Sequence, residues 1–247
     1  MMSKTFVPVD DPRAIAVTKA IQTGDAESLQ AQLSEHKELV SAYIGSSDEA
    51  RTLLHLLTDW PGHFPNNAAI ARILIEAGCD LNAQYVGKLH SETPLHWTAS
   101  CDDLEVMDIL LDAGADINAG GGVIADTALA DARAFLQPKC AHRLVERGAI
   151  VSLQDAATLG LMNRVQEMYA ASPKPSQRDT NCAFWNACHG SQLESAQFLH
   201  NQGADVNFVP PWGPDTPLDE AKEQKAEDLS NWLEALGAKG KDGLNSS

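Results

Sequence analysis

The sequence is poor in basic residues and has no long apolar run. Its 247 residues include 18 Lys and Arg against 34 Asp and Glu, so the formal net charge is −16 at pH 7. Because an acidic surface repels phosphate groups, nucleic acid is not expected as a partner. A membrane-spanning helix needs about 18 or more consecutive apolar residues, and no such run occurs, so a membrane is not expected either. The first residues also lack the apolar stretch of a secretory signal.

Cysteine is scarce, and its spacing does not suggest metal chemistry. The chain has five cysteines, at positions 79, 101, 140, 182 and 188. This number is odd, and the spacing matches neither a CxxC motif nor a zinc pattern. We therefore expect free buried thiols in the reducing cytoplasm, with no metal site and no cofactor.

What the sequence does contain is a recurring segment. The stretch TPLHWTA begins at Thr93, and its relatives are RTLLHLLT at 51–58, DTALADA at 126–132 and DTPLDEA at 215–221. Each is followed by a Leu-containing stretch that ends at glycine, as in DILLDAGADINA at 108–119. Threonine is a good helix N-cap, and glycine ends helices in a left-handed turn. Each copy therefore predicts a pair of short helices.

These residues strongly resemble the ankyrin repeat, whose pattern is T-P-L-H-x-A followed by L-L-x-x-G-A-D. The resemblance implies an all-α fold: an α-solenoid of helix–turn–helix repeats with short β-hairpin fingers. It predicts an N-terminal tail at 1–11, a single ankyrin-repeat domain at 12–238 and a C-terminal tail at 239–247. About seven units are expected, the first and last as caps, starting near residues 12, 51, 93, 127, 151, 182 and 216.

The resemblance also assigns a structural role to three residues. His55 and His96 occupy the histidine position of the ankyrin pattern, where the imidazole commonly bonds backbone and neighbouring turns. Trp185 takes the place of this histidine in a later unit and is expected in the core.

The second unit is longer than the usual ankyrin repeat of about 33 residues. The extra residues lie in an insertion at 58–67 and in a long finger at 83–92. The insertion carries Trp60 and His63, and the finger carries His90. Since none of these three has an evident role in the scaffold, each is a candidate binding residue.

The junction after the fourth unit is shorter than usual. Only 24 residues separate Thr127 from Val151, so the finger between these two units is essentially missing. A long finger on one side and a missing one here predict a notch in the row of fingers. A notch of this kind suits a pocket better than a flat protein-binding face.

Polar residues replace apolar ones at one position of the first helices. This position holds Leu56 and Trp97 in the second and third units, but Asp131, Asp155 and Asn186 in the next three. A buried carboxylate costs several kcal/mol unless it has a partner. These residues are therefore either solvated or bonded to finger backbone, or they form the polar floor of a ligand site.

His189 is the candidate base for such a site. It lies three residues after Asn186, on the same face of the helix, and Thr158 is the equivalent neighbour of Asp155. Trp60, Trp97 and Phe135 are expected to supply apolar walls. Trp212 lies in the last finger between prolines, where an exposed indole is typical of a contact residue.

Two functions from different classes follow, and the sequence leaves both open. In the first, the array binds an unidentified protein through its concave groove and fingers; the acidic balance favours a basic partner. In the second, the chain is a small-molecule-binding protein or an acid–base hydratase, lyase or hydrolase, with its pocket around the fourth to sixth repeats. The candidate catalytic residues are then Asp131, Asp155 and His189. The candidate binding residues are Trp60, His63, His90, Trp97, Phe135, Asn186 and Trp212.

Overall fold

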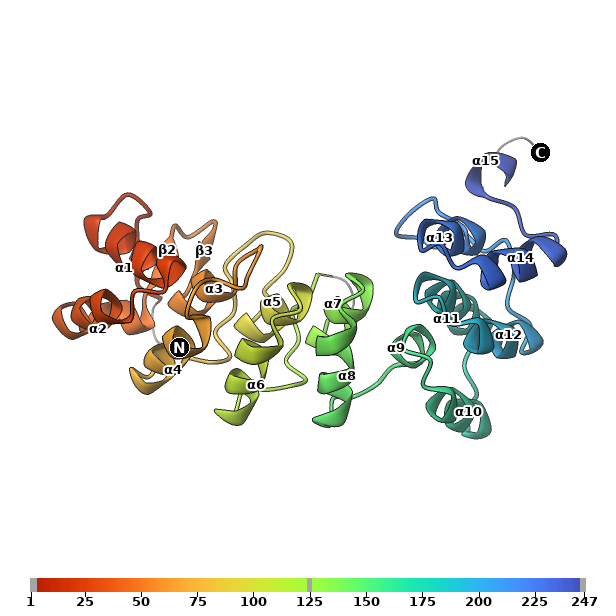
Figure 1. Cartoon of the computed structure of the whole chain (residues 1–247), viewed down its shortest axis with the longest axis horizontal. Coiled ribbons are helices and arrows are strands. Elements are labelled where there is room, and N and C mark those ends of the chain that lie inside the picture. The colour runs from red at the N-terminus through yellow and green to blue at the C-terminus, as the bar shows by residue number, and fades with distance from the viewer. Residues whose placement is uncertain (1–3, 124–125, 245–247) are drawn as a thin grey trace. The chain divides into compact units, whose positions relative to one another are not determined.

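A computed structural model describes residues 4–123 and 126–244. Its fold class is the predicted one, all-α, with successive helix–turn–helix repeats and few short strands (Figure 1). Contacts between Cα atoms divide the chain into two compact units, unit 1 at residues 1–150 and unit 2 at residues 151–247. Each unit is described by itself, and the single domain at 12–238 stays a prediction.

Unit 1 is built from pairs of consecutive helices that pack together. Its pairs are α1 (Pro12–Thr23) with α2 (Ala26–Glu35), α3 (Leu53–Thr58) with α4 (Asn67–Glu76), α5 (Pro94–Ser100) with α6 (Leu104–Asp112), and α7 (Ala128–Ala134) with α8 (Pro138–Glu146). A 3-10 helix, η1 (Lys37–Ser41), follows α2. The first helices of successive pairs also contact one another, α1 with α3, α3 with α5 and α5 with α7, and so form a continuous row.

In unit 1, helices begin and end at residues of the kinds that the sequence predicted. Thr93 caps α5, and Pro94 occupies the first turn, where a backbone donor is not needed. Gly114 follows α6 with a φ of +99°, which a residue with a Cβ adopts only under strain. The chain can therefore reverse at this point and enter the next finger.

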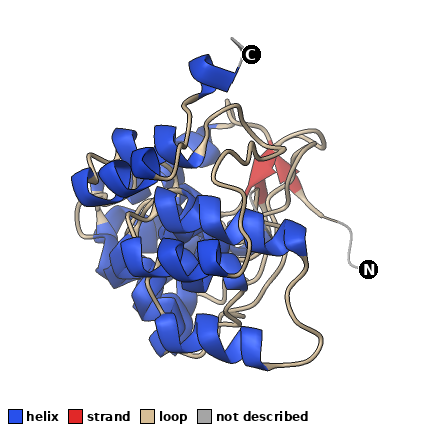
Figure 2. Ribbon diagram, turned by 90° about the vertical axis from the view of Figure 1, so that its right-hand side faces the viewer, coloured by secondary structure: helices blue, strands red, loops and turns tan. Residues whose placement is uncertain are grey.

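A three-stranded sheet joins the fingers at the N-terminal end of unit 1. Its order is β1 (Phe6–Val7), β2 (Tyr43–Gly45) and β3 (Ala50–Arg51), shown in red in Figure 2. β1 pairs in parallel with β2, with Phe6 opposite Tyr43, and β2 pairs antiparallel with β3. Ala50 exchanges two backbone hydrogen bonds with Val86, of 2.9 and 2.8 Å, so the long finger continues the sheet. The segment predicted as the N-terminal tail thus contains a strand.

Unit 2 continues the pairing of helices. Its pairs are α9 (Leu153–Thr158) with α10 (Met162–Ala170), α11 (Gln177–His189) with α12 (Leu193–Asn201), and α13 (Pro217–Glu223) with α14 (Glu227–Ala235), followed by the short α15 (Lys241–Leu244). Its core is formed around buried residues of these helices, among them Phe184, Leu199 and Leu233, all 0% exposed.

The start predicted for the sixth repeat was wrong. Its first helix begins at Gln177, five residues before the predicted start at Cys182. The reason is a capping box: Ser176 caps the helix, and Asp179 accepts hydrogen bonds from the Ser176 N–H and Oγ. This box lies about two turns upstream of its equivalents in the other repeats of unit 2, so α11 has 13 residues whereas α9 has 6 and α13 has 7.

Within the described residues, none of the helices is both long enough and apolar enough to cross a bilayer.

Candidate functional site

A surface groove lies beside α1 in unit 1. It has a volume of about 1010 Å³, and one of its walls is the short sheet. Val9 and Ile15 line it with 68% and 55% of their surface exposed, whereas Leu56, at 5%, lies deeper. Exposed aliphatic side chains around a concavity are typical of an interaction surface. We call this the N-terminal groove; its other lining residues are Pro8, Asp10, Thr18, Lys19, Gln22, Thr23, Ile44, Gly45, Ser46, Glu49 and Arg51.

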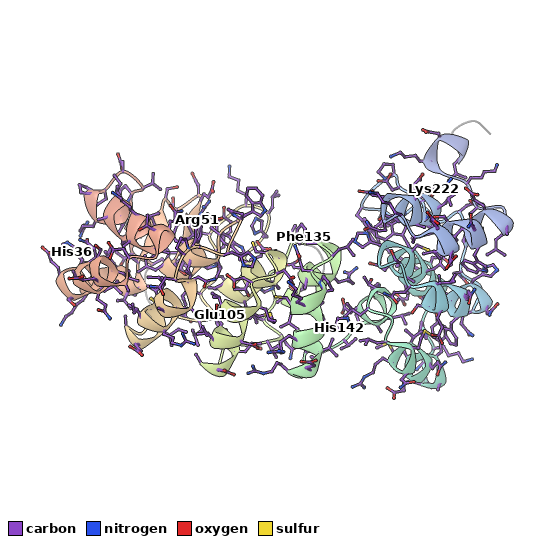
Figure 3. All side chains as sticks on the ribbon, in the orientation of Figure 1. His36, Arg51, Glu105, Phe135, His142 and Lys222 are labelled. Atoms are coloured by element: carbon purple, nitrogen blue, oxygen red, sulfur yellow. The ribbon has the colours of Figure 1, made fainter. Side chains whose placement is uncertain are left out.

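The charged residues of the N-terminal groove balance one another. Two are acidic, Asp10 and Glu49, and two are basic, Lys19 and Arg51. Arg51 makes ion pairs with Glu49 at 3.2 Å and with Asp59 at 2.6 Å. It ends the strand β3, two residues before α3 begins, and is labelled in Figure 3. Since Asp59 follows the end of α3, the Arg51 side chain links the two ends of this helix.

Arg51 also connects the N-terminal groove to Trp97. Its guanidinium carbon lies 5.7 Å from the centre of the Trp97 ring, within the range of a cation–π contact. The Trp97 Nε1–H donates a 2.9 Å hydrogen bond to the buried carboxylate of Glu92. His55 packs edge-on against the same indole, with ring centres 4.9 Å apart. Trp97 is therefore held on several sides, which favours a fixed orientation.

His90 belongs to the same cluster, which the sequence did not indicate. Its ring stacks on Tyr85, with centres 4.9 Å apart and an interplanar angle of 13°. Its Nδ1 lies 2.8 Å from Glu92 Oε2, the oxygen that also accepts from Trp97. The predicted binding residues His90 and Trp97 are thus brought together through Glu92.

The insertion at 58–67 presents Trp60 to solvent. This indole is 82% exposed, the most of any tryptophan among the described residues. The loop is held after Trp60 by two contacts: the Asn66 side chain donates to the Gly24 carbonyl at 3.2 Å, and His63 Nε2 lies 2.9 Å from the Cys101 carbonyl oxygen. His63 therefore has a structural contact, whereas Trp60 is left available.

Phe135 and Asp131 belong to α7 and its C-terminal end. Phe135, labelled in Figure 3, is 50% exposed and lies at the C-cap of α7. Asp131 is fully buried, and a Cβ on Gly122 would lie 3.0 Å from its Oδ2. The backbone at Gly122 thus passes close to this carboxylate.

The other predicted polar residues lie in unit 2. Asp155 is 2% exposed and closes a capping box: its Oδ2 accepts from the Ser152 N–H at 2.9 Å and from Ser152 Oγ at 2.6 Å. Asn186 is 1% exposed and donates from Nδ2 to the Cys182 carbonyl at 2.8 Å. Thr158 Oγ donates to the Asn186 carbonyl at 3.1 Å. These contacts satisfy side-chain groups and support the helices α9 and α11.

His189 pairs with a carboxylate that the sequence did not indicate. Its Nδ1 lies 2.7 Å from Oε2 of Glu220, a buried residue of α13. Its ring stacks on Trp185, with centres 5.2 Å apart, and Trp212 packs edge-on against Trp185 at 5.4 Å. Trp185 is buried, as predicted, while Trp212 remains 55% exposed.

Burial sets the protonation of the two capping histidines. It lowers the pKa of His55 to about 4, and it also lowers the pKa of His96. Burial also raises the pKa of the Cys79 thiol to about 12 and that of Cys101 to about 11. Both imidazoles are therefore neutral at pH 7, and both thiols are protonated and poorly nucleophilic.

Sequence reasoning missed Ile15, Arg51, Glu92 and Glu220. The groove residues were missed because they come from separate places in the chain: Pro8 and Val9 after β1, Ile15 on α1, and Ile44 and Gly45 on β2. The two glutamates were missed because their partners are side chains of other elements: Glu220 lies 31 residues from His189 in sequence. For Glu92, the available signal was its position directly before the capping residue Thr93.

Comparison with known proteins agrees with the helix pairs described above. A family model described as ankyrin repeats (3 copies) matches residues 16–121 and 64–155, which together span more than half of the chain. A search of the curated proteins finds no match.

Proposed function

The chain belongs to the ankyrin-repeat family, and from this premise we propose that it binds another protein through the N-terminal groove of unit 1. Ankyrin repeats generally mediate protein–protein interaction, so a protein partner is the expected ligand. We choose this surface because its groove of about 1010 Å³ is lined by the exposed side chains Val9 and Ile15.

The surroundings of the groove favour a preformed binding site. The sheet at its wall is tied to the next finger by the two hydrogen bonds between Ala50 and Val86. Arg51 is held by two carboxylates and by the Trp97 ring. A surface that is already ordered loses less conformational entropy on binding, which favours affinity.

A comparison of three baits tests the proposal. The wild-type chain, Ile15→Glu and the matched Ile150→Glu are each used to capture proteins from the cells that express the chain. Ile150 is 71% exposed and does not line the groove, so both variants place the same charge at an exposed isoleucine. Circular dichroism verifies that both variants are folded.

We expect a partner that is captured by the wild type and by Ile150→Glu but lost with Ile15→Glu. The purified partner should then bind Ile15→Glu at least about tenfold more weakly, since a charge buried against apolar groups costs more than about 1.4 kcal/mol. If every captured protein binds Ile15→Glu as well as the wild type, the groove is not the binding site.

The small-molecule or acid–base enzyme function stays a prediction. Its candidate residues fall in different units, Asp131 in unit 1 and Asp155 and His189 in unit 2. The contacts with Ser152 and Glu220 give Asp155 and His189 roles in the scaffold, and these roles favour the protein-binding proposal.

A further inference from the structure

We propose that the partner segment of the N-terminal groove is a cationic amphipathic peptide segment, with apolar side chains against Val9 and Ile15 and a basic side chain on the face of Trp60. This inference rests on the proposed function and specifies the chemistry of the partner. Three observations carry it: the balance of charge inside the groove, the acidity of unit 1, and the position of Trp60.

The groove itself selects apolar side chains. Its two acidic and two basic lining residues balance, so its wall favours no net charge. Val9 and Ile15 leave more than half of their surface in water, and covering them releases about 25 cal/mol per Å² of apolar area. Leu56 and Ile44, both 5% exposed, add two buried apolar side chains to the lining. The central residues of the partner segment are therefore apolar.

The surroundings of the groove select basic flanks. Unit 1, residues 1–150, has 21 Asp and Glu against 11 Lys and Arg. A segment that extends beyond the balanced groove enters the field of this excess negative charge. The same field disfavours a second copy of the chain as the occupant, because each copy has a formal net charge of −16. Basic residues on both sides of an apolar centre match this distribution.

Trp60 supplies a specific contact for one of these basic residues. It directly follows Asp59, and the Asp59 carboxylate binds Arg51, which lines the groove. Trp60 is 82% exposed on a loop held by His63 and Asn66, so its ring is available at little entropic cost. An Arg or Lys over an indole strengthens binding about twofold to fivefold at an exposed site. Trp60 thus recognises a cation that the acidic surroundings attract.

Two peptide libraries test the inference with the full-length chain. Both display peptides of about 16 residues, roughly 24 Å as a helix, with the same randomised apolar pattern in the centre. One library has Lys and Arg at its flanks and the other has Asp and Glu. Selected peptides are then measured by fluorescence anisotropy against the wild type, Ile15→Glu, Trp60→Ala, Trp60→Phe and the control Ile150→Glu.

We expect binders from the cationic library alone. Ile15→Glu should weaken them at least about tenfold, and Trp60→Ala about threefold, corresponding to the lower range of a cation–π contact. Trp60→Phe should retain most of the affinity because it keeps an aromatic face, and Ile150→Glu should leave it unchanged. Raising the salt concentration from about 50 mM to about 300 mM should weaken binding, because it screens the attraction of the flanks.

Several results would overturn the inference. They are binders from the anionic library, no binder from the cationic one, cationic peptides that bind Ile15→Glu like the wild type, or equal affinity for wild type, Trp60→Ala and Trp60→Phe. Its failure differs from failure of the proposed function. A natural partner that is lost with Ile15→Glu but binds through an acidic segment would preserve the proposed function and contradict only the cationic partner.

Discussion

Unit 1 and unit 2 connect successive repeats with different residues at the same place. In unit 1, His55 Nε2 lies 3.0 Å from the Glu92 carbonyl oxygen, and His96 Nε2 lies 3.2 Å from that of Asp126. In unit 2, Trp185 Nε1–H donates to the Asp215 carbonyl at 2.8 Å. Each of these carbonyls belongs to the residue directly before the capping Thr of the next repeat, at 93, 127 and 216. Each finger carbonyl thus meets an N–H donor from the preceding repeat, and either an imidazole or an indole ring supplies this donor.

The histidines combine this connection with the helix cap, whereas unit 2 separates the two tasks. His55 Nδ1 accepts from the Thr52 N–H at 3.3 Å, so the ring proton is on Nε2 and faces the next finger. The capping boxes of unit 2 use Asp155, Asp179 and Asp219 instead. An ionised carboxylate only accepts hydrogen bonds and cannot donate to a finger carbonyl. Trp185 therefore performs the inter-repeat task there.

The largest expected difference between the units comes from removing one such residue. His55→Ala should destabilise unit 1 by about 4 kcal/mol, since it leaves a cavity in place of a fully buried ring and removes bonds to Thr52 and Glu92. Urea denaturation measures the loss. Hydrogen exchange should show the added opening in peptides of unit 1. Equal opening in both units would contradict the assignment of this residue to the coupling within unit 1.

The next effect is a dependence on pH that belongs to unit 1. Unfolded histidine has a pKa near 6.5, whereas burial lowers that of His55 to about 4. Between these values the unfolded chain binds a proton that the native chain does not, so stability falls as the pH falls from 6.5 to 4. The loss is about 3 kcal/mol at pH 4 and below, and the lowered pKa of His96 acts in the same direction.

The caps of unit 2 respond to pH in another range. Burial raises the pKa of Asp219, but hydrogen bonds from Thr216 outweigh this effect, so the pKa lies below its ordinary value of 3.8. Its contribution is present above pH 3.8 and is lost only below it. Hydrogen exchange between pH 6.5 and 4, corrected for the intrinsic rate, should therefore increase more at 52–58 than at 216–223. The difference should shrink in His55→Asn; an unchanged difference would rule out His55 as its source.

Trp185→Phe removes the donor of unit 2 and keeps an aromatic ring. We expect a destabilisation of about 1–2 kcal/mol, because the Asp215 carbonyl loses a partner and the smaller ring packs less well against His189 and Trp212. Thermal unfolding measures the change, and Trp232→Phe serves as the control for loss of an indole. A cost no greater than that of the control would mean that the hydrogen bond to the finger contributes little.

The smallest expected effect is the loss of a cap that has no inter-repeat role. Asp179→Ala removes the acceptor for the Ser176 N–H and Oγ at an exposed helix start, which costs roughly 0.5–1 kcal/mol. Denaturation of this variant beside His55→Ala compares a local cap with a cap that also reaches the next repeat. A loss as large as that of His55→Ala would remove the distinction drawn between the two kinds of cap.

Much of the fold was predictable because its signals are local. Thr93, Pro94 and Gly114 determine a helix start and a helix end through their own backbone and side-chain geometry. The burial of Trp185 was predictable from its place in the pattern. The start of α11 was not, because Ser176 and Asp179 lie outside the repeat pattern and form a box of their own.

Less of the candidate site was predictable. Trp60 was identified correctly as lying on an insertion, and its exposure of 82% agrees with a contact role that stays a prediction. Asp131 and Asp155 were predicted to occupy equivalent positions of their helices. However, α9 has six residues where α7 has seven, so Asp155 lies three residues after its cap, Ser152, whereas Asp131 lies four residues after Thr127. There it accepts a hydrogen bond from its own cap, Ser152, a contact that the shared position in the repeats did not indicate.

The sequence by itself determined the repeats, the capping residues, the acidity and the exposed insertion, because each depends on residues close together in the chain. Only the tertiary structure decided which side chains meet. Glu92 joins His90 to Trp97, Glu220 meets His189, and β1 pairs with β2, whose residues Ile44 and Gly45 line the N-terminal groove. The contact between Glu220 and His189 depends on how neighbouring repeats pack, and a packing register is set by the shapes of many side chains together rather than by any one segment. The Glu92 contacts are close in sequence, but they depend on the three-dimensional path of the finger.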